Sequence, residues 1–119
     1  SKPIMTTLYG INNCDTIKKT RSLLTELGVD YDFHDYKKLG CDEALIKKLL
    51  KHFDFKSLVN TRGTTWRKLP DAVKKDLSEA SAIKIMSENN SIIKRPIIES
   101  QGKWLLGFDK EEIQALAQD

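Results

Sequence analysis

The stretch MTTLYGINNCDTIKKTRSLLTELGVDYDFHDY, residues 5–36, decides the fold of this chain. It begins with a short β-prone run at residues 5–9. From Asp15 the apolar side chains recur at helical spacing until Gly28, and residues 31–36 then alternate aromatic with polar side chains. The stretch therefore predicts a strand, a helix and a second strand, which is a βαβ unit with parallel strands.

The middle of the chain predicts helices. Apolar side chains recur at helical spacing in three segments, 42–53, 70–76 and 78–89. Between the first two lies LVNTRGTTWRKL, residues 58–69, which we predict to be a loop because it is rich in Thr and Gly.

The C-terminal part returns to strands. RPIIES (95–100) and KWLLGF (103–108) predict two strands joined by a tight turn at Gln101-Gly102, a pair that can supply positive φ. A final helix is expected to begin at Asp109, whose side chain could cap it. The predicted order is β-α-β, a helical block, and then β-β-α, which is an α/β chain.

The composition limits the classes of function. The chain has 119 residues, and its 20 Lys and Arg against 17 Asp and Glu leave a net charge of +3, too mild to indicate nucleic acid. No apolar run approaches the roughly 20 residues that span a bilayer, and no hydrophobic signal-peptide core precedes the first strand. We therefore expect a soluble, cytoplasmic protein with neither nucleic acid nor a membrane as partner.

Cys14 stands directly before the first predicted helix. Backbone N–H groups are unpaired at a helix start and the helix dipole is positive there, so the thiolate is favoured. Lys18 and Lys19 add positive charge and Asp15 opposes them, which predicts a modest lowering of the pKa. The alternative interpretation is a small buried side chain, a role that free cysteines often take.

The second cysteine, Cys41, is interpreted as a residue at the entry of the next helix. It is the only internal thiol that could compete with an external one in resolving an adduct on Cys14, and the two cysteines are too far apart in sequence to form a CxxC pair. His34 and His52 lie away from any motif, so the scattered cysteines and histidines predict no metal site.

Four segments together resemble the landmarks of the arsenate reductase (ArsC-like) family. They are YGINNCDTIKKT (9–20), NTRGTTWRKL (60–69), KRPIIE (94–99) and LLGFDKEEI (105–113), in the family's order. The resemblance is greatest to the YffB-type branch, to which the Spx regulators are related. It implies a thioredoxin-like fold with a mixed four-stranded sheet. It also implies one domain, residues 1–119, with a helical insertion at about 39–91 between the second and third strands.

The resemblance also assigns the site. It implies that Cys14 is the catalytic nucleophile and that Asn13, Arg62, Arg95 and Pro96 surround the substrate. In thioredoxin-like folds a cis-proline faces the active cysteine, and the resemblance places it at Pro96. Guanidinium groups suit the arginine positions because their forked donors bind oxyanions and stabilise a nearby thiolate.

The resemblance implies a monothiol oxidoreductase, and we expect a glutathione-dependent thiol/disulfide reductase. Ile17 stands where thioredoxin relatives often carry a second cysteine, so an external thiol must resolve the adduct, with glutathione as co-substrate and glutaredoxin as a further candidate partner. No bound cofactor is expected. Two alternatives stay open: an arsenate reductase, although Gly107 lies where that activity has a third arginine, and an Spx-like regulator that binds RNA polymerase without catalysis.

Overall fold

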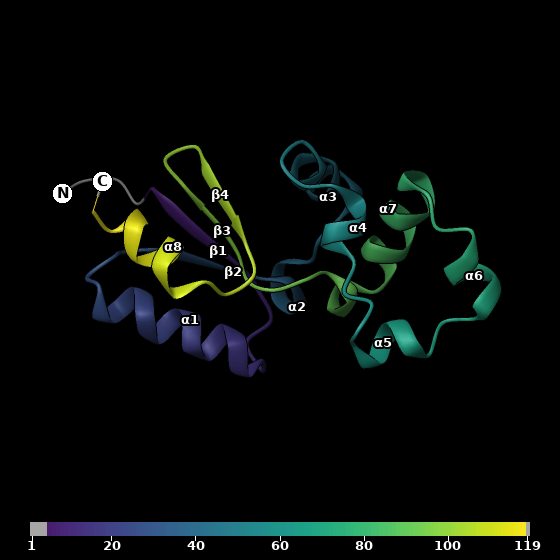
Figure 1. The fold of residues 1–119 in the computed structure, drawn as a ribbon, viewed down its shortest axis with the longest axis horizontal. Coiled ribbons are helices and arrows are strands. Elements are labelled where there is room, and N and C mark those ends of the chain that lie inside the picture. The colour runs from purple at the N-terminus through teal and green to yellow at the C-terminus, as the bar shows by residue number, and fades with distance from the viewer. Residues whose placement is uncertain (1–4, 119) are drawn as a thin grey trace. The chain divides into compact units, whose positions relative to one another are not determined.

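The computed structural model describes residues 5–118. The chain forms two compact units. One combines the residues up to Leu39 with those from Arg95 onward, and the other is Gly40–Lys94. The first unit contains the sheet and the second consists of helices (Figure 1). The expectation of a single domain with an insertion at about 39–91 stays a prediction.

The first unit is built on a four-stranded mixed sheet, as predicted. Its strands are β1 (Thr6–Gly10), β2 (Asp32–Asp35), β3 (Ile97–Ser100) and β4 (Lys103–Leu106). Their spatial order is β2-β1-β3-β4, with β1 parallel to β2 and the other two pairs antiparallel. The parallel pair is the βαβ unit that the first 36 residues predict.

Two helices of this unit, α1 (Asp15–Glu26) and α8 (Lys110–Leu116), cover one face of the sheet (Figure 1). The side chains at the centre of this layer are fully buried: Leu8 and Ile98 from the sheet, Ile17 and Leu24 from α1, and Ile113 from α8. Burying each such side chain stabilises the fold by about 1.5–3 kcal/mol. This core therefore fixes α1, and the residue that begins it, against the sheet.

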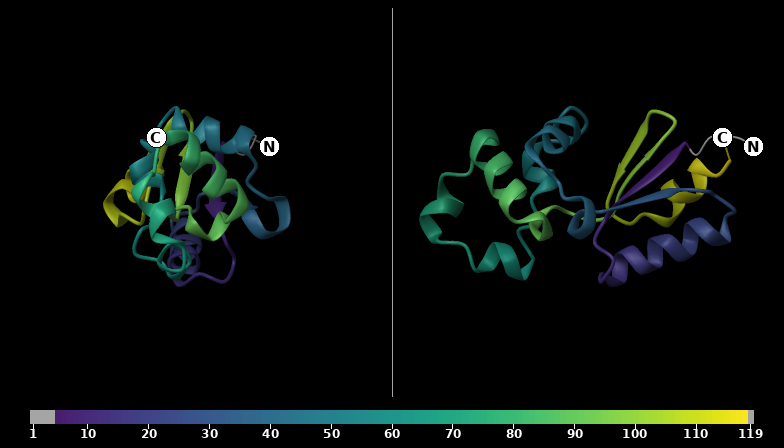
Figure 2. Two further views of the ribbon diagram at one scale, coloured as in Figure 1. Left: turned by 90° about the vertical axis from the view of Figure 1, so that its right-hand side faces the viewer. Right: turned by 180° about the vertical axis from the view of Figure 1, so that it is seen from behind.

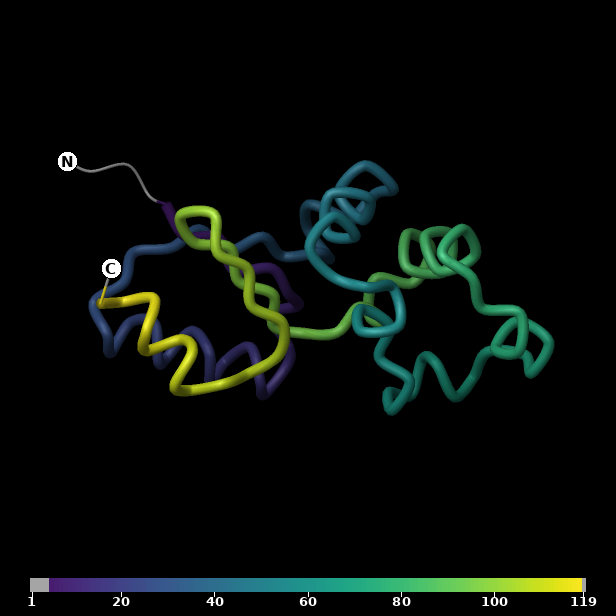
Figure 3. Tube along the Cα trace, turned by 45° about the horizontal axis from the view of Figure 1, so that its top comes forward, coloured from purple at the N-terminus to yellow at the C-terminus, as the bar shows by residue number. Residues whose placement is uncertain are grey.

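The turn between β3 and β4 explains their antiparallel register. Gln101 and Gly102 both have positive φ, 52° and 84°. Two successive residues of positive φ make a turn whose twist matches that of the flanking strands. The register that follows pairs Ser100 with Lys103 and Ile97 with Leu106, and Figure 3 shows the twisted hairpin as a continuous tube.

The second unit is helical, and α2 (Tyr36–Leu39) precedes it directly after β2. Its elements are α3 (Glu43–Leu50), α4 (Phe55–Leu58), α5 (Thr64–Arg67), α6 (Asp71–Lys75), α7 (Glu79–Glu88) and the 3₁₀ turn η1 (Asn90–Ile92). Helices α3 and α7 lie side by side (Figure 2). Their fully buried residues are Ile46, Leu49, Ala82 and Met86.

The prediction of a continuous loop at 58–69 is wrong, because α5 occupies its centre. A helix of four residues makes about one turn, so it cannot show the repeated apolar spacing on which the prediction depends. Within residues 5–118, none of the helices is long and apolar enough to cross a membrane.

Candidate active site

Cys14 is the N-cap residue of α1. Its backbone is extended, with φ −131° and ψ 127°, and its carbonyl oxygen accepts the first helical hydrogen bond from Lys18 N at 3.0 Å. The thiol is partly exposed. This position turns the side chain toward the N-terminal end of the helix, where backbone N–H groups have no helical acceptor.

The end of β1 approaches α1 closely just before this loop. A Cβ atom built on Gly10 would collide with Cδ1 of Ile17, and would lie 2.9 Å from its Cγ1. A side chain at this position would therefore force the fully buried Ile17 side chain to move. The sequence therefore carries a glycine here for packing beside the cysteine.

Several groups act on the pKa of the Cys14 thiol in opposite directions. Burial raises it. The backbone N–H of Ile17, a hydrogen bond from the Arg95 side chain, the backbone N–H of Thr16 and the charge of Arg95 lower it, and their sum leaves the pKa below its ordinary value. The sulfur makes no close cap hydrogen bond, so the N–H groups act on it mainly through their dipoles. The predicted lowering is confirmed in direction.

The positive charge beside Cys14 comes from a distant part of the sequence. Arg95 lies directly before β3, and its guanidinium both donates to the sulfur and favours its charged form. Lys19, which sequence proximity suggested as a source of this charge, instead places its Nζ 4.4 Å from the centre of the Phe108 ring. The cation that acts on the Cys14 sulfur is therefore Arg95, which the tertiary structure brings to the site, and not the neighbouring Lys19.

The peptide bond between Arg95 and Pro96 is cis, which confirms the expectation for this proline. The Pro96 carbonyl oxygen accepts a hydrogen bond from Gly107 N at 2.8 Å. The segment after β4 is thereby tied to the segment that begins β3. Gly107 has φ +87°, a conformation that side chains other than glycine rarely adopt.

The other two predicted site residues, Asn13 and Arg62, are both exposed. Asn13 is exposed in the loop immediately before Cys14. Arg62 is an exposed residue of the helical unit, and its backbone N–H donates to Asn60 Oδ1 at 3.2 Å. A role for Asn13 or Arg62 in holding a substrate stays a prediction.

Cys41 lies in a different chemical environment. It is only 3% exposed. Burial, together with the neighbouring charge of Asp42, raises the pKa of its thiol to about 12. Of the two thiols, Cys14 is therefore the more accessible and the one whose pKa is lowered, which are the properties expected of a reactive cysteine.

The part of the chain that the structure describes also has no group of three or more His, Cys, Asp or Glu side chains arranged to hold a metal ion. The chemistry that the described residues offer therefore centres on a single thiolate with an arginine beside it.

The fold is that of the thioredoxin-like proteins. A glutaredoxin from Archaeoglobus fulgidus shares it with a TM-score of 0.51 at 19% identity, covering 98% of this chain and 88% of its own. Within this class the chain belongs to the ArsC family, which it matches over residues 9–116.

The similar proteins agree with this assignment. A solved structure of a protein named YffB is 44% identical, with a TM-score of 0.89 over 94% of this chain and 98% of its own. An arsenate reductase (ArsC) related protein from Brucella melitensis is 43% identical, with a TM-score of 0.79 over 97% and 96%. An uncharacterised protein of Haemophilus influenzae is 42% identical over 93% of this chain and 97% of its own. The global transcriptional regulator Spx of Streptococcus pyogenes is more distant, at 29% over 93% and 84%.

Proposed function

We propose that this protein is a monothiol oxidoreductase that reduces disulfides with glutathione, with Cys14 as the nucleophile. The observation that carries the proposal is the environment of the Cys14 sulfur. Burial alone would raise its pKa, yet the N–H groups of α1 and the guanidinium of Arg95 lower it. A thiolate that is stabilised and still accessible can attack a disulfide near neutral pH.

The proposed reaction has two exchange steps. The Cys14 thiolate attacks the glutathione sulfur of a mixed disulfide, the sulfur–sulfur bond breaks, and the released thiolate of the substrate takes up a proton. Cys14 is then joined to glutathione. A second glutathione thiolate attacks the glutathione sulfur of this adduct, which releases the Cys14 thiolate and oxidised glutathione.

The need for an external thiol follows from the second cysteine. Cys41 is buried and its pKa is raised to about 12, so it is a poor candidate to resolve an adduct on Cys14. Ile17, three residues after Cys14, is fully buried and offers no thiol. Glutathione is the resolving thiol that we propose, and its carboxylates suit the guanidinium of Arg95.

Arsenate is the second candidate substrate, since the family takes its name from arsenate reduction and an ArsC-related protein is 43% identical. The resemblance places a third arginine of the arsenate reductases at Gly107. Each charge-assisted hydrogen bond contributes about 1.5–3 kcal/mol, so its loss lowers transition-state binding by about tenfold to a hundredfold or more. We therefore expect weak arsenate reduction at most.

The test measures both activities on one preparation. Turnover of a glutathione mixed disulfide and reduction of arsenate are assayed side by side, with Cys14→Ser as the blank and Arg62→Ala as the probe of the predicted anion-binding arginine. We expect mixed-disulfide turnover that Cys14→Ser abolishes. Efficient arsenate reduction without mixed-disulfide turnover would reverse the ranking of the two substrates.

A binding role without catalysis is the remaining alternative, because the Spx regulators are relatives of this chain. Wild-type protein that turns over neither substrate, but retains purified RNA polymerase on an affinity column, would favour that role. Cys14→Ser serves as the matched control, since a regulator that does not use the thiol would bind equally well without it.

A further inference from the structure

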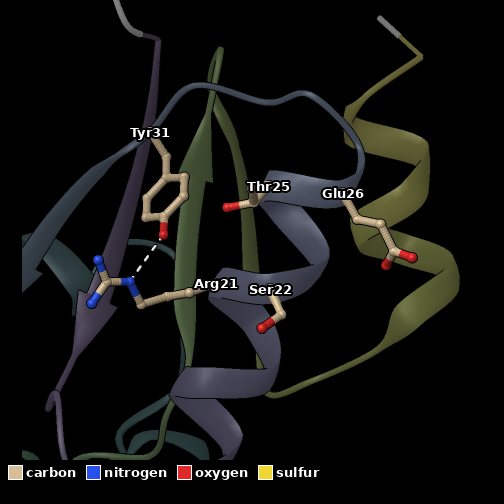
Figure 4. Close-up of a pocket in the computed structure, with 5 residues that line it drawn as sticks. All are labelled: Arg21, Ser22, Thr25, Glu26 and Tyr31. Carbon is tan, nitrogen blue, oxygen red and sulfur yellow. Dashed lines mark hydrogen bonds between the residues drawn. The ribbon is translucent and has the colours of Figure 1, made fainter.

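Arg21 is a basic residue of α1 whose side chain is held in one place by several partners. Its Nε donates to the hydroxyl of Tyr31 at 2.9 Å. Its guanidinium carbon also lies 4.7 Å from the centre of the Phe33 ring, close enough for a cation–π contact. Figure 4 shows the side chain extending from α1 to the Tyr31 hydroxyl. Arg21 is half-buried, and these contacts anchor its side chain to β2 and to the residue before that strand.

A second nitrogen of the same guanidinium reaches the loop that carries Cys14. Nη1 of Arg21 donates to Oδ1 of Asn12 at 3.2 Å. Asn12 lies two residues before Cys14, in the short connection between β1 and α1. The planar guanidinium therefore joins three parts of the unit: α1, the edge strand β2 and the middle of the cysteine loop.

The conformation of this loop decides where the Cys14 sulfur points. Ile17, Thr16 and Arg95 lower the pKa of the Cys14 thiol, and they act on it in the extended backbone conformation that Cys14 has at the N-cap position. Ile11 is buried and anchors the β1 end of the loop. The bond from Arg21 restrains the following residue, Asn12, so it limits the backbone rotations that would swing the sulfur away from its partners.

We propose that Arg21 is a positioning residue for the nucleophile: through its bond to Asn12, and held by Tyr31 and Phe33, it fixes the loop that aims the Cys14 sulfur. The inference rests on the proposed role of Cys14. Arg21 acts through the loop and not through its own charge, since the charged side chain that acts on the sulfur is that of Arg95. The other charged groups close to Cys14 in the chain are Asp15 and Lys18, on its own helix.

The Arg21–Asn12 bond is exposed, so its removal should change the free energy of unfolding little. A purely structural role and a positioning role therefore differ in what they alter. If the bond only stabilises the fold, its removal lowers the midpoint of unfolding. If it positions the nucleophile, its removal shifts the pH profile of Cys14 reactivity while the midpoint stays nearly the same.

The experiment measures the rate of Cys14 alkylation by iodoacetamide against pH in the full chain. Arg21→Met removes the donors and keeps much of the aliphatic stem, and Asn12→Ala removes the acceptor. We expect each variant to react about 3- to 10-fold more slowly than the wild type at about pH 6, because fewer molecules hold the thiolate geometry. At a pH where the thiol is fully ionised, the rates should converge. Arg67→Met, an exposed arginine of α5, controls for the loss of one positive charge.

Two further variants separate the loop mechanism from a charge effect. Arg21→Lys keeps the charge but replaces the two separate nitrogens that donate to Tyr31 and Asn12 with one nitrogen on a flexible stem, so we expect it to resemble Arg21→Met. The double variant Arg21→Met/Asn12→Ala should be no slower than either single variant, because both remove the same bond.

Normal reactivity of Asn12→Ala beside slow Arg21→Met would show that Arg21 does not act through its bond to Asn12 and would overturn the proposal, as would unchanged profiles in both. If Arg21→Met does not fold, Asn12→Ala and Arg21→Lys decide the question. Alkylation measures the reactivity of Cys14 and does not depend on glutathione turnover. A wild-type protein without glutathione turnover would therefore refute the proposed function, while the alkylation rates would still test the role of Arg21.

Discussion

Replacing Arg95 with methionine tests the main electrostatic feature of the site. Arg95 donates a hydrogen bond to the Cys14 sulfur and adds a favourable charge, and both lower the pKa of the thiol. The substitution removes them and retains most of the aliphatic stem of the side chain. Because Cys14 and its backbone N–H partners remain in place, the variant isolates the contribution of the guanidinium.

The expected size of the effect follows from the kind of bond that is lost. A hydrogen bond to a charged group contributes about 1.5–3 kcal/mol. Cys14 is partly exposed, so solvent screens the interaction, and we take roughly half of that value. At a pH below the lowered pKa of Cys14, the fraction of thiolate should then fall by about 3- to 15-fold, since about 1.4 kcal/mol is a factor of ten.

Stopped-flow alkylation across the pH range measures this fraction directly. The inflection of the rate profile should move to higher pH in Arg95→Met, and Arg95→Lys should restore part of the reactivity because it keeps the charge. Lys94→Met, an exposed lysine one residue away, is the matched control and should follow the wild type. An Arg95→Met profile that superimposes on the wild type would refute the assignment of Arg95 as the group that stabilises the thiolate.

Three other outcomes follow from the described residues. Gly10→Ala should lower the free energy of unfolding in urea by about 1–3 kcal/mol, because its added Cβ collides with Ile17. The added change Ile17→Val should recover part of this loss. A Gly10→Ala variant as stable as the wild type would contradict the close approach of β1 to α1. Alkylation at neutral pH with a limiting amount of reagent should modify Cys14 before Cys41, which peptide mass spectrometry can show. Labelling of Cys41 first would refute the opposite shifts in the pKa values of the two thiols. Because burial raises the pKa of Cys41 to about 12 from 9.0, its proton stabilises the folded chain fully below about pH 9 and less as the pH rises, by up to about 1.4 kcal/mol per pH unit. The comparison is made in a Cys14→Ser background, with and without the further change Cys41→Ala. The loss of stability with rising pH that comes from Cys41 should disappear in Cys41→Ala. Equal slopes in the two chains would contradict the raised pKa of Cys41.

The order of the elements was accessible from the sequence because it depends on local patterns. Helical spacing after Asp15, the end of that spacing at Gly28 and the turn pair Gln101-Gly102 are properties of neighbouring residues, and each appears in the structure as expected. The one-turn helix α5 was missed, since four residues contain no repeat. The sequence pattern also indicated a reactive Cys14, because a helix start acts on its own N-cap residue.

Local sequence patterns did not identify the charged partner of that cysteine: the family resemblance implied Arg95, and the tertiary structure shows how it reaches the sulfur. Arg95 reaches Cys14 because β3 lies beside β1 in the sheet, and no pattern of residue spacing encodes that pairing. Periodicity likewise identified Phe33 as a strand residue but not as the platform for Arg21. The physical reason is the range of the forces involved: backbone propensities and caps act within about one turn of a helix, whereas side chains distant in sequence meet only after burial of the core has set the strand order.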